Sequence, residues 1–89
     1  MKKKDFLEKY LNTQSPTGWE TAGQKVWLDY IKPYVDETFT DVYGTAVGII
    51  KGDGKYKVCI EAHADEIGWN VSYIDDKGYI SVVRNGGSD

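Results

Sequence analysis

The stretch that decides the fold is residues 38–43, which read T-F-T-D-V-Y. Its β-branched and aromatic residues alternate with other residues, a period of two that favours an extended strand, and Gly44 then breaks the pattern. Upstream of this stretch the apolar residues recur at helical spacing, over residues 3–12 and again from about Gly18 to residue 32. Pro33 ends the second helix, because the residue before a proline is pushed out of the helical region. We therefore predict two helices before residue 37 and strands after it.

The start of the second helix carries a possible capping signal. Thr17 and Glu20 match the S/T-x-x-E capping box, in which each side chain accepts a hydrogen bond from the other residue's backbone N–H. We therefore expect these two residues to cap a helix that begins near Gly18.

Downstream, two hairpins are predicted. Residues 45–50 are expected to pair with residues 55–62 across the G-D-G turn at 52–54, and residues 69–74 with residues 79–83 across a D-D-K-G turn. The predicted order is α-α-β-β-β-β-β, an α/β arrangement with two N-terminal helices and about five strands. Two helices cannot cover five strands, so we expect an incomplete part of a larger α/β domain.

Composition excludes several classes of function. The 89 residues carry a net charge of −3 with the acidic residues dispersed, which gives no basic surface for nucleic acid. No apolar run approaches the ~18 residues that cross a bilayer. The single cysteine, Cys59, cannot form an internal disulfide, and its place between Val58 and Ile60 predicts a small buried side chain. We expect a cytoplasmic protein with neither a nucleic-acid nor a membrane partner.

One cluster of potential catalytic groups occurs, at residues 61–68, E-A-H-A-D-E-I-G. In an extended chain His63 and Asp65 share one face, with Cα atoms about 6.6 Å apart at ~3.3 Å per residue. An aspartate that accepts a hydrogen bond from one imidazole nitrogen turns the other toward a metal ion. A lone histidine at a strand end is more often a surface residue or a structural residue with its hydrogen bonds satisfied, and the H-x-D spacing occurs often by chance, so the residues alone leave both interpretations open and favour the structural one.

Four segments together resemble a known family. They are residues 12–20 (N-T-Q-S-P-T-G-W-E), 41–44 (D-V-Y-G), 63–68 (H-A-D-E-I-G) and 86–89 (G-G-S-D), in this order. The chain is similar to the opening of the tetrahedral aminopeptidases, dinuclear metallopeptidases that include glutamyl and deblocking aminopeptidases and proteins labelled endoglucanases.

The resemblance implies a doubly wound α/β dinuclear-metallopeptidase domain. Residues 1–89 would form its N-terminal part, and an inserted dimerisation domain would start near residues 69–89. It implies two divalent metal ions, zinc or cobalt, a short peptide substrate and a homo-oligomer. His63 matches the family's first metal ligand and Asp65 the catalytic-site carboxylate that orients it, whereas Glu66 receives no catalytic role and is expected to be a surface or capping acid.

The family's other metal ligands, its general-base glutamate and its second histidine are expected outside these 89 residues. We therefore expect the full-length protein to be a metallo-aminopeptidase, and the isolated chain to be inactive and to bind metal weakly. The alternative is a complete small noncatalytic binding or interaction module that retained part of the fold.

Overall fold

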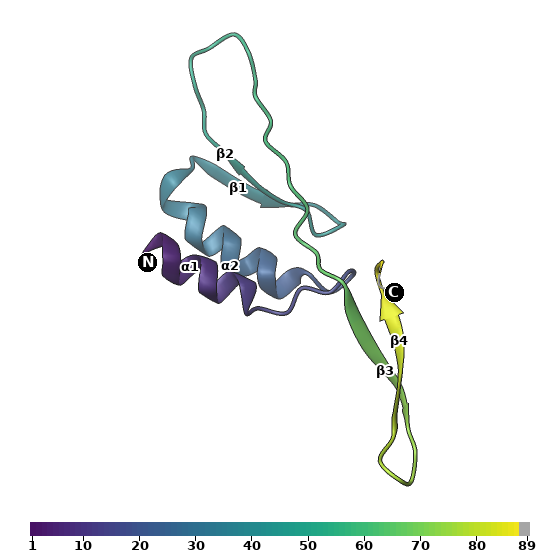
Figure 1. The fold of residues 1–89 in the computed structure, drawn as a ribbon. Helices are drawn as coiled ribbons and strands as arrows, with labels where there is room; N and C mark the ends of the chain where they lie inside the picture. The colour runs from purple at the N-terminus through teal and green to yellow at the C-terminus, as the bar shows by residue number, and fades with distance from the viewer. Residues whose placement is uncertain (88–89) are drawn as a thin grey trace.

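The computed structural model describes residues 1–87, which form two helices, one short 3-10 helix and four strands in a mixed α/β arrangement (Figure 1). In chain order these elements are α1 (Lys3–Leu11), α2 (Thr21–Ile31), a 3-10 turn (Lys32–Tyr34), β1 (Glu37–Thr40), β2 (Ala46–Ile49), β3 (Gly68–Ile74) and β4 (Ile80–Asn85). The strands form two separate antiparallel pairs, β1–β2 and β3–β4.

The two helices lie side by side and are joined through aromatic rings. Phe6 of α1 stacks on Tyr30 of α2 with ring centroids 3.9 Å apart, and Tyr10 lies beside Phe6 at 5.7 Å. Gly23 allows a close approach, since a Cβ atom there would lie 2.1 Å from the Ser15 hydroxyl oxygen. The predicted helix at residues 3–12 is confirmed, and the predicted second helix is present with a later start.

The predicted capping box is wrong. Helix α2 begins at Thr21, and no side chain caps its N-terminus. The Glu20 carboxylate accepts a hydrogen bond from the Gly18 N–H at 2.7 Å, while the Thr17 hydroxyl donates to Asp65. Gly18 has a φ of +89°, so the chain turns sharply there and begins the helix three residues later.

Helix α2 packs against β2. A Cβ atom at Gly48 would lie 2.5 Å from the Ile31 Cδ1 atom, so the glycine lets this strand approach the helix closely. The pairing of β2 differs from the prediction, because its partner is β1, with Phe39 opposite Val47.

Residues 55–62 form no strand, so the predicted 45–50/55–62 hairpin is wrong and the described residues contain four strands, one fewer than the five predicted. The Asp36 carboxylate accepts a hydrogen bond from the Lys51 N–H at 2.6 Å, which extends the contact between the β1 and β2 strands past their ends. A strand requires a hydrogen-bonded neighbouring strand, and residues 55–62 have none in the part of the chain that the structure describes. Cys59 is therefore exposed, contrary to the prediction that it is buried.

The two hairpins turn in the same way. In each, an aspartate side chain accepts hydrogen bonds from the backbone N–H groups two and four residues later, all at 2.9 Å. A glycine three residues after the aspartate has a positive φ, +84° at Gly44 and +85° at Gly78. The D-V-Y-G-T and D-D-K-G-Y sequences thus build equivalent turns after Thr40 and Ile74.

The β3–β4 hairpin confirms the predicted pairing of residues 69–74 with residues 79–83, with a register shift between Val71 and Tyr73. It projects away from the helices, and residues 50–62 project on the other side of the molecule (Figure 1). The radius of gyration is 17.4 Å, whereas a compact domain of this length has about 12 Å.

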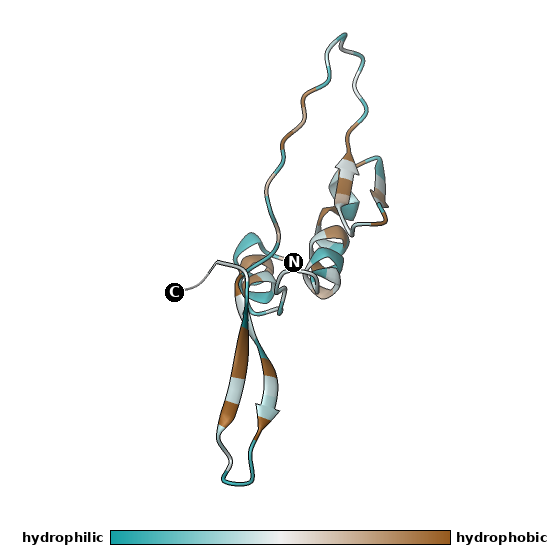
Figure 2. Ribbon diagram, turned by 90° about the vertical axis from the view of Figure 1, so that its right-hand side faces the viewer, coloured by the Kyte–Doolittle hydropathy of each residue, from teal (hydrophilic) through white to brown (hydrophobic). Residues whose placement is uncertain are grey.

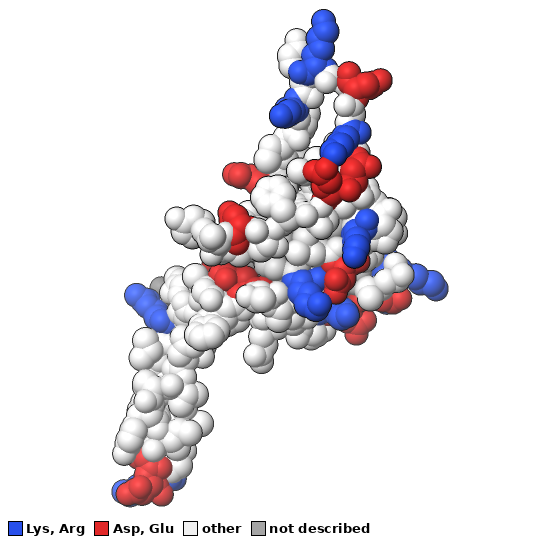
Figure 3. Space-filling model, turned by 180° about the vertical axis from the view of Figure 1, so that it is seen from behind, with Lys and Arg blue, Asp and Glu red and all other residues white. Residues whose placement is uncertain are grey.

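No apolar side chain among residues 1–87 is fully buried. Apolar residues alternate along the projecting hairpin (Figure 2), and on the face seen in Figure 3 charged side chains lie at its tip and at its base, whereas the stretch between them shows none. The exposed large apolar residues of the hairpin are Trp69, Val71, Tyr73, Ile74, Tyr79, Ile80, Val82 and Val83. Contiguous apolar surface of this kind marks a contact face.

One short contact ties the N-terminal part of the chain to the segment before β3. We call it the 15–17/66 bridge. The Glu66 N–H donates to the Ser15 carbonyl at 2.9 Å, the Thr17 N–H donates to the Glu66 carbonyl at 3.2 Å, and the Ser15 N–H donates to the Glu66 carboxylate at 3.1 Å. Ser15 is the buried polar residue of the described chain, 6% exposed. The bridge therefore joins residues about 50 positions apart through both main-chain and side-chain hydrogen bonds.

We expect Gly44→Ala to lower the free energy of unfolding by about 1–2 kcal/mol, because an alanine strongly disfavours a positive φ. Gly54→Ala is the matched control, since this loop glycine has no positive φ and no atom within 4 Å of a built Cβ. Thermal or urea unfolding followed by circular dichroism measures both. Equal stability of the two variants would contradict the assigned turn geometry.

We expect Glu66→Ala to speed hydrogen exchange at the Ser15 amide, because that amide loses its carboxylate acceptor. The Thr17 amide, bonded to the Glu66 main-chain carbonyl, should remain protected and serves as the internal reference. Glu66→Gln keeps an acceptor oxygen and should leave Ser15 exchange unchanged. Equal exchange rates at Ser15 in the wild type and the alanine variant would refute the side-chain part of the bridge.

Candidate functional site

The predicted site residues lie together just before β3. The His63 Nδ1 atom and the Asp65 Oδ1 atom are 3.0 Å apart, a hydrogen-bonding distance. The imidazole projects outward, with 85% of its side chain exposed, whereas the Asp65 side chain is 36% exposed. This contact brings together the two residues that the sequence placed on one face, although the segment before them is not the predicted strand.

Asp65 is held from two directions. Its Oδ2 atom accepts a hydrogen bond from the Thr17 hydroxyl at 2.7 Å, and its Oδ1 atom faces the imidazole. The Thr17 hydrogen bond, followed by the one to His63, lowers the pKa of Asp65 below its ordinary value of 3.8. Asp65 is therefore ionised at neutral pH and can act only as an acceptor, so an uncharged His63 ring donates from Nδ1.

This arrangement leaves the other ring nitrogen available. With Nδ1 donating to Asp65, Nε2 carries the lone pair on the exposed side of the ring. A neutral imidazole nitrogen is a ligand for zinc and related divalent ions, and a carboxylate on the opposite nitrogen fixes the tautomer and raises the basicity. The geometry can therefore supply one oriented nitrogen ligand.

Thr17 is the member of this cluster that sequence reasoning assigned elsewhere, as a helix cap. It lies 48 residues before Asp65 in the chain. No local pattern reports so distant a contact, so the sequence carried no signal for it. The Glu66 carboxylate accepts a hydrogen bond from the Ser15 N–H in the 15–17/66 bridge, and it takes no part in the contact between His63 and Asp65.

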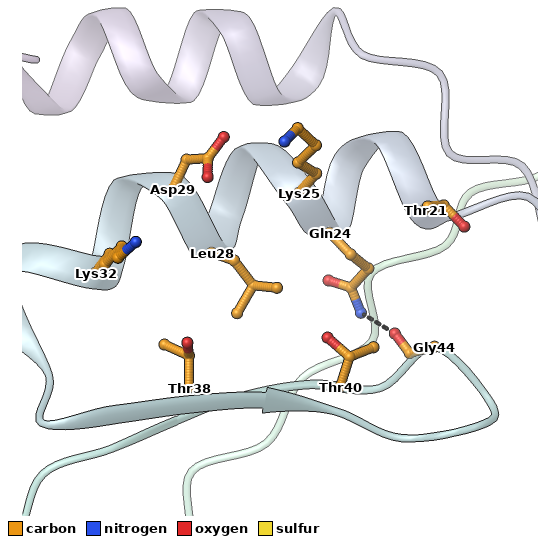
Figure 4. Close-up of a pocket in the computed structure, with 9 residues that line it drawn as sticks. All are labelled: Thr21, Gln24, Lys25, Leu28, Asp29, Lys32, Thr38, Thr40 and Gly44. Carbon is orange, nitrogen blue, oxygen red and sulfur yellow. Dashed lines mark hydrogen bonds between the residues drawn. The ribbon is translucent and has the colours of Figure 1, made fainter.

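The described residues do not form a complete metal site, since residues 1–87 contain no group of three or more His, Cys, Asp or Glu side chains that could hold an ion. A groove of about 370 Å³ lies elsewhere, between α2 and β1, where Gln24 donates to the Gly44 carbonyl at 3.1 Å (Figure 4). Its lining residues are Thr21, Gln24, Lys25, Leu28, Asp29, Lys32, Thr38, Thr40 and Gly44. None of them belongs to the His63 cluster, so this groove is separate from the candidate site.

Neither of the helices in residues 1–87 has the length and apolar character of a membrane span.

The chain is similar to aminopeptidases in both sequence and structure. It is 39% identical over 83 residues to a putative aminopeptidase from Acetivibrio thermocellus, an alignment that covers 93% of this chain and 25% of that protein. Its structure superposes on an aminopeptidase from the archaeon Desulfurococcus kamchatkensis with a TM-score of 0.86 and 34% identity, over 94% of this chain and 24% of that one. A TET aminopeptidase from a marine sediment archaeon of the Thaumarchaeota gives a TM-score of 0.85 with 28% identity, over 94% of this chain and 23% of that one.

The chain thus spans about a quarter of the length of these relatives. A family model described as M42 glutamyl aminopeptidase matches residues 44–89, more than half of the chain. This range includes His63, Asp65 and the G-G-S-D segment at 86–89. The last two residues of that segment, Ser88 and Asp89, lie outside the described residues. The predicted resemblance is therefore confirmed, and the chain belongs to the M42 glutamyl aminopeptidase family.

Proposed function

We propose that this chain is a segment of a metal-dependent aminopeptidase that removes N-terminal residues from short peptides. In this proposal His63 ligates one of two divalent ions, zinc or cobalt, and Asp65 orients the imidazole. The observation that carries the proposal is the 3.0 Å contact between His63 Nδ1 and Asp65 Oδ1 beneath an exposed ring.

The donor chemistry fits a divalent ion but is incomplete. An imidazole nitrogen suits zinc and cobalt, which take nitrogen, sulfur and oxygen ligands in protein sites. One ligand cannot hold two ions, so the remaining ligands and the general base would come from sequence outside residues 1–89. When bound, such ions supply Lewis-acid chemistry that polarises the scissile carbonyl.

The roles of this chain's own residues follow from their contacts. Asp65 keeps the proton of the neutral ring on Nδ1, and its lowered pKa keeps it anionic at the pH at which a peptidase works. His63 leaves Nε2 free of the Asp65 contact on a side chain that is 85% exposed. By this proposal, the segment positions a ligand and does not itself cleave the peptide, so the isolated chain is inactive.

The wider parts of the proposal have separate support. The exposed apolar β3–β4 hairpin fits the start of an inserted dimerisation domain near residues 69–89, within an N-terminal part of the catalytic domain that spans residues 1–89. A homo-oligomer and a peptide substrate are supported by the similarity to the TET aminopeptidase. The lone exposed Cys59 is consistent with a cytoplasmic location, where thiols stay reduced.

We expect His63→Ala, made in the product of the complete gene, to lose one metal ion per subunit and all measurable peptidase activity. Asp65→Asn should lose activity partially, by about 10–100-fold, because the amide can orient the ring but cannot raise its basicity. Metal content by elemental analysis and hydrolysis of aminoacyl p-nitroanilides measure the two effects.

Asp53→Asn is the matched control, because it changes an exposed carboxylate in the loop at 51–55, which lies outside the Thr17–Asp65–His63 hydrogen bonds. It should retain wild-type activity and metal content. A His63→Ala protein that holds the full complement of ions and cleaves peptides would overturn the ligand assignment.

We also expect the isolated chain of 89 residues to bind zinc with a dissociation constant no tighter than about 10 μM, because a single imidazole lacks the four ligands of a tight zinc site. Isothermal titration calorimetry measures this. Stoichiometric binding below 1 μM would show that the chain contains further ligands and would contradict the proposed incomplete site.

A further inference from the structure

The Asp65 carboxylate divides its two oxygens between two partners. Its Oδ1 atom faces His63 Nδ1 at 3.0 Å, and its Oδ2 atom accepts the Thr17 hydroxyl at 2.7 Å. A carboxylate bonded through only one oxygen can rotate about its terminal torsion, which has a broad energy profile. The hydrogen bond from Thr17 removes that freedom while leaving Oδ1 directed at the ring.

Thr17 is suited to this task because its own backbone is fixed on both sides. Its N–H donates to the Glu66 carbonyl at 3.2 Å, and its carbonyl accepts from the Asn85 side-chain amide at 2.7 Å. These partners belong to the segment before β3 and to the end of β4. The position of the Thr17 main chain, from which the hydroxyl projects, is therefore set by contacts independent of the bond that the hydroxyl makes to Asp65.

The alternative use of Thr17, as a helix cap, is not the one the structure shows. Helix α2 begins four residues later, at Thr21, and no side chain caps it. The Thr17 hydroxyl is directed instead across the chain toward a residue 48 positions away. The Thr17 hydroxyl therefore does not cap α2, and its hydrogen bond instead contributes to the orientation of the Asp65 carboxylate.

We propose that Thr17 is a positioning residue for the candidate metal site: its hydroxyl holds Asp65 so that Oδ1 accepts the Nδ1 proton of His63 and Nε2 stays available to a metal ion. The inference rests on the proposed function for its consequence in catalysis. Its structural core, the control of the His63 tautomer by a residue at position 17, can be measured without any metal.

The test compares Thr17→Val with Thr17→Ser in the product of the complete gene. Valine keeps the shape of threonine and lacks the hydroxyl, whereas serine keeps the hydroxyl. In the metal-free protein at pH 8, nitrogen-15 NMR of the imidazole, assigned by its absence in His63→Gln, should show the Nδ1–H tautomer in the wild type and in Thr17→Ser. In Thr17→Val the ring should become a mixture of both tautomers.

Zinc affinity, measured by competition with a chelating dye, should fall about tenfold in Thr17→Val and return to the wild-type value in Thr17→Ser, as losses of outer-shell contacts do. Thr13→Val is the matched control. It also removes a threonine hydroxyl, one that donates to the Lys9 carbonyl at 2.7 Å at the end of α1, and should change neither the tautomer nor the affinity.

A double-mutant cycle asks whether Thr17 acts through Asp65. If it does, Thr17→Val should change zinc affinity little once Asp65 is alanine, because the carboxylate it positions is gone. Additive losses would overturn the proposal. If the valine variant does not fold, the pair Thr17→Ala and Thr17→Ser, which differ only in the hydroxyl and fit the space of threonine, supports the same comparison.

The outcomes separate this inference from the proposed function. The role of the hydroxyl would be refuted if Thr17→Val kept the wild-type tautomer and zinc affinity. It would also be refuted if Thr17→Val and Thr17→Ser lost zinc affinity equally. Either result would leave His63 as a ligand. Unchanged metal content in His63→Ala would refute the ligand assignment, and the metal-free NMR comparison would still decide whether Thr17 positions the Asp65–His63 pair.

Discussion

The 15–17/66 bridge is the contact on which the geometry of the candidate site depends. It places the N-terminal loop against the segment before β3, and within residues 1–87 the side-chain hydrogen bond that reaches Asp65 from outside its own segment comes from Thr17. Because the bridge uses main-chain groups in both directions, it fixes the relative position of two segments that share no helix or strand. Through Asp65, the loop that follows α1 thus contributes to the orientation of His63, although this loop and the histidine lie far apart in the sequence.

Features with local causes were predictable from the sequence. The helical spacing before residue 37 and the D-D-K-G turn gave α1, α2 and the β3–β4 hairpin, because residues within a few positions determine them. The two-residue spacing of His63 and Asp65 placed them on one face even though the segment is irregular and not a strand, since an extended backbone alternates its side chains with or without a partner.

Features with distant causes were not predictable. The alternation at residues 55–62 is that of a strand, yet no described segment pairs with it, and residues 46–49 pair with β1 instead. Thr17 fits a capping box by its position in the sequence, but its hydroxyl donates a hydrogen bond to Asp65, 48 residues away. In both cases the local sequence pattern predicts one structure and the tertiary contacts decide another. Residues 55–62 lack a partner strand, and Thr17 has a distant partner. A short window of sequence contains neither kind of information.

The unpaired stretch at residues 55–62 has a consequence for the life of the chain in the cell. Tyr56, Val58 and Ile60 are exposed apolar residues at alternate positions of a segment that pairs with no strand in residues 1–87, and exposed, unpaired apolar segments favour intermolecular cross-β stacking. Lys57 and Glu61 alternate with them and act as gatekeepers, since stacking identical copies in register would bring like charges together. The charges that oppose in-register stacking thus lie at positions adjacent to the exposed apolar residues.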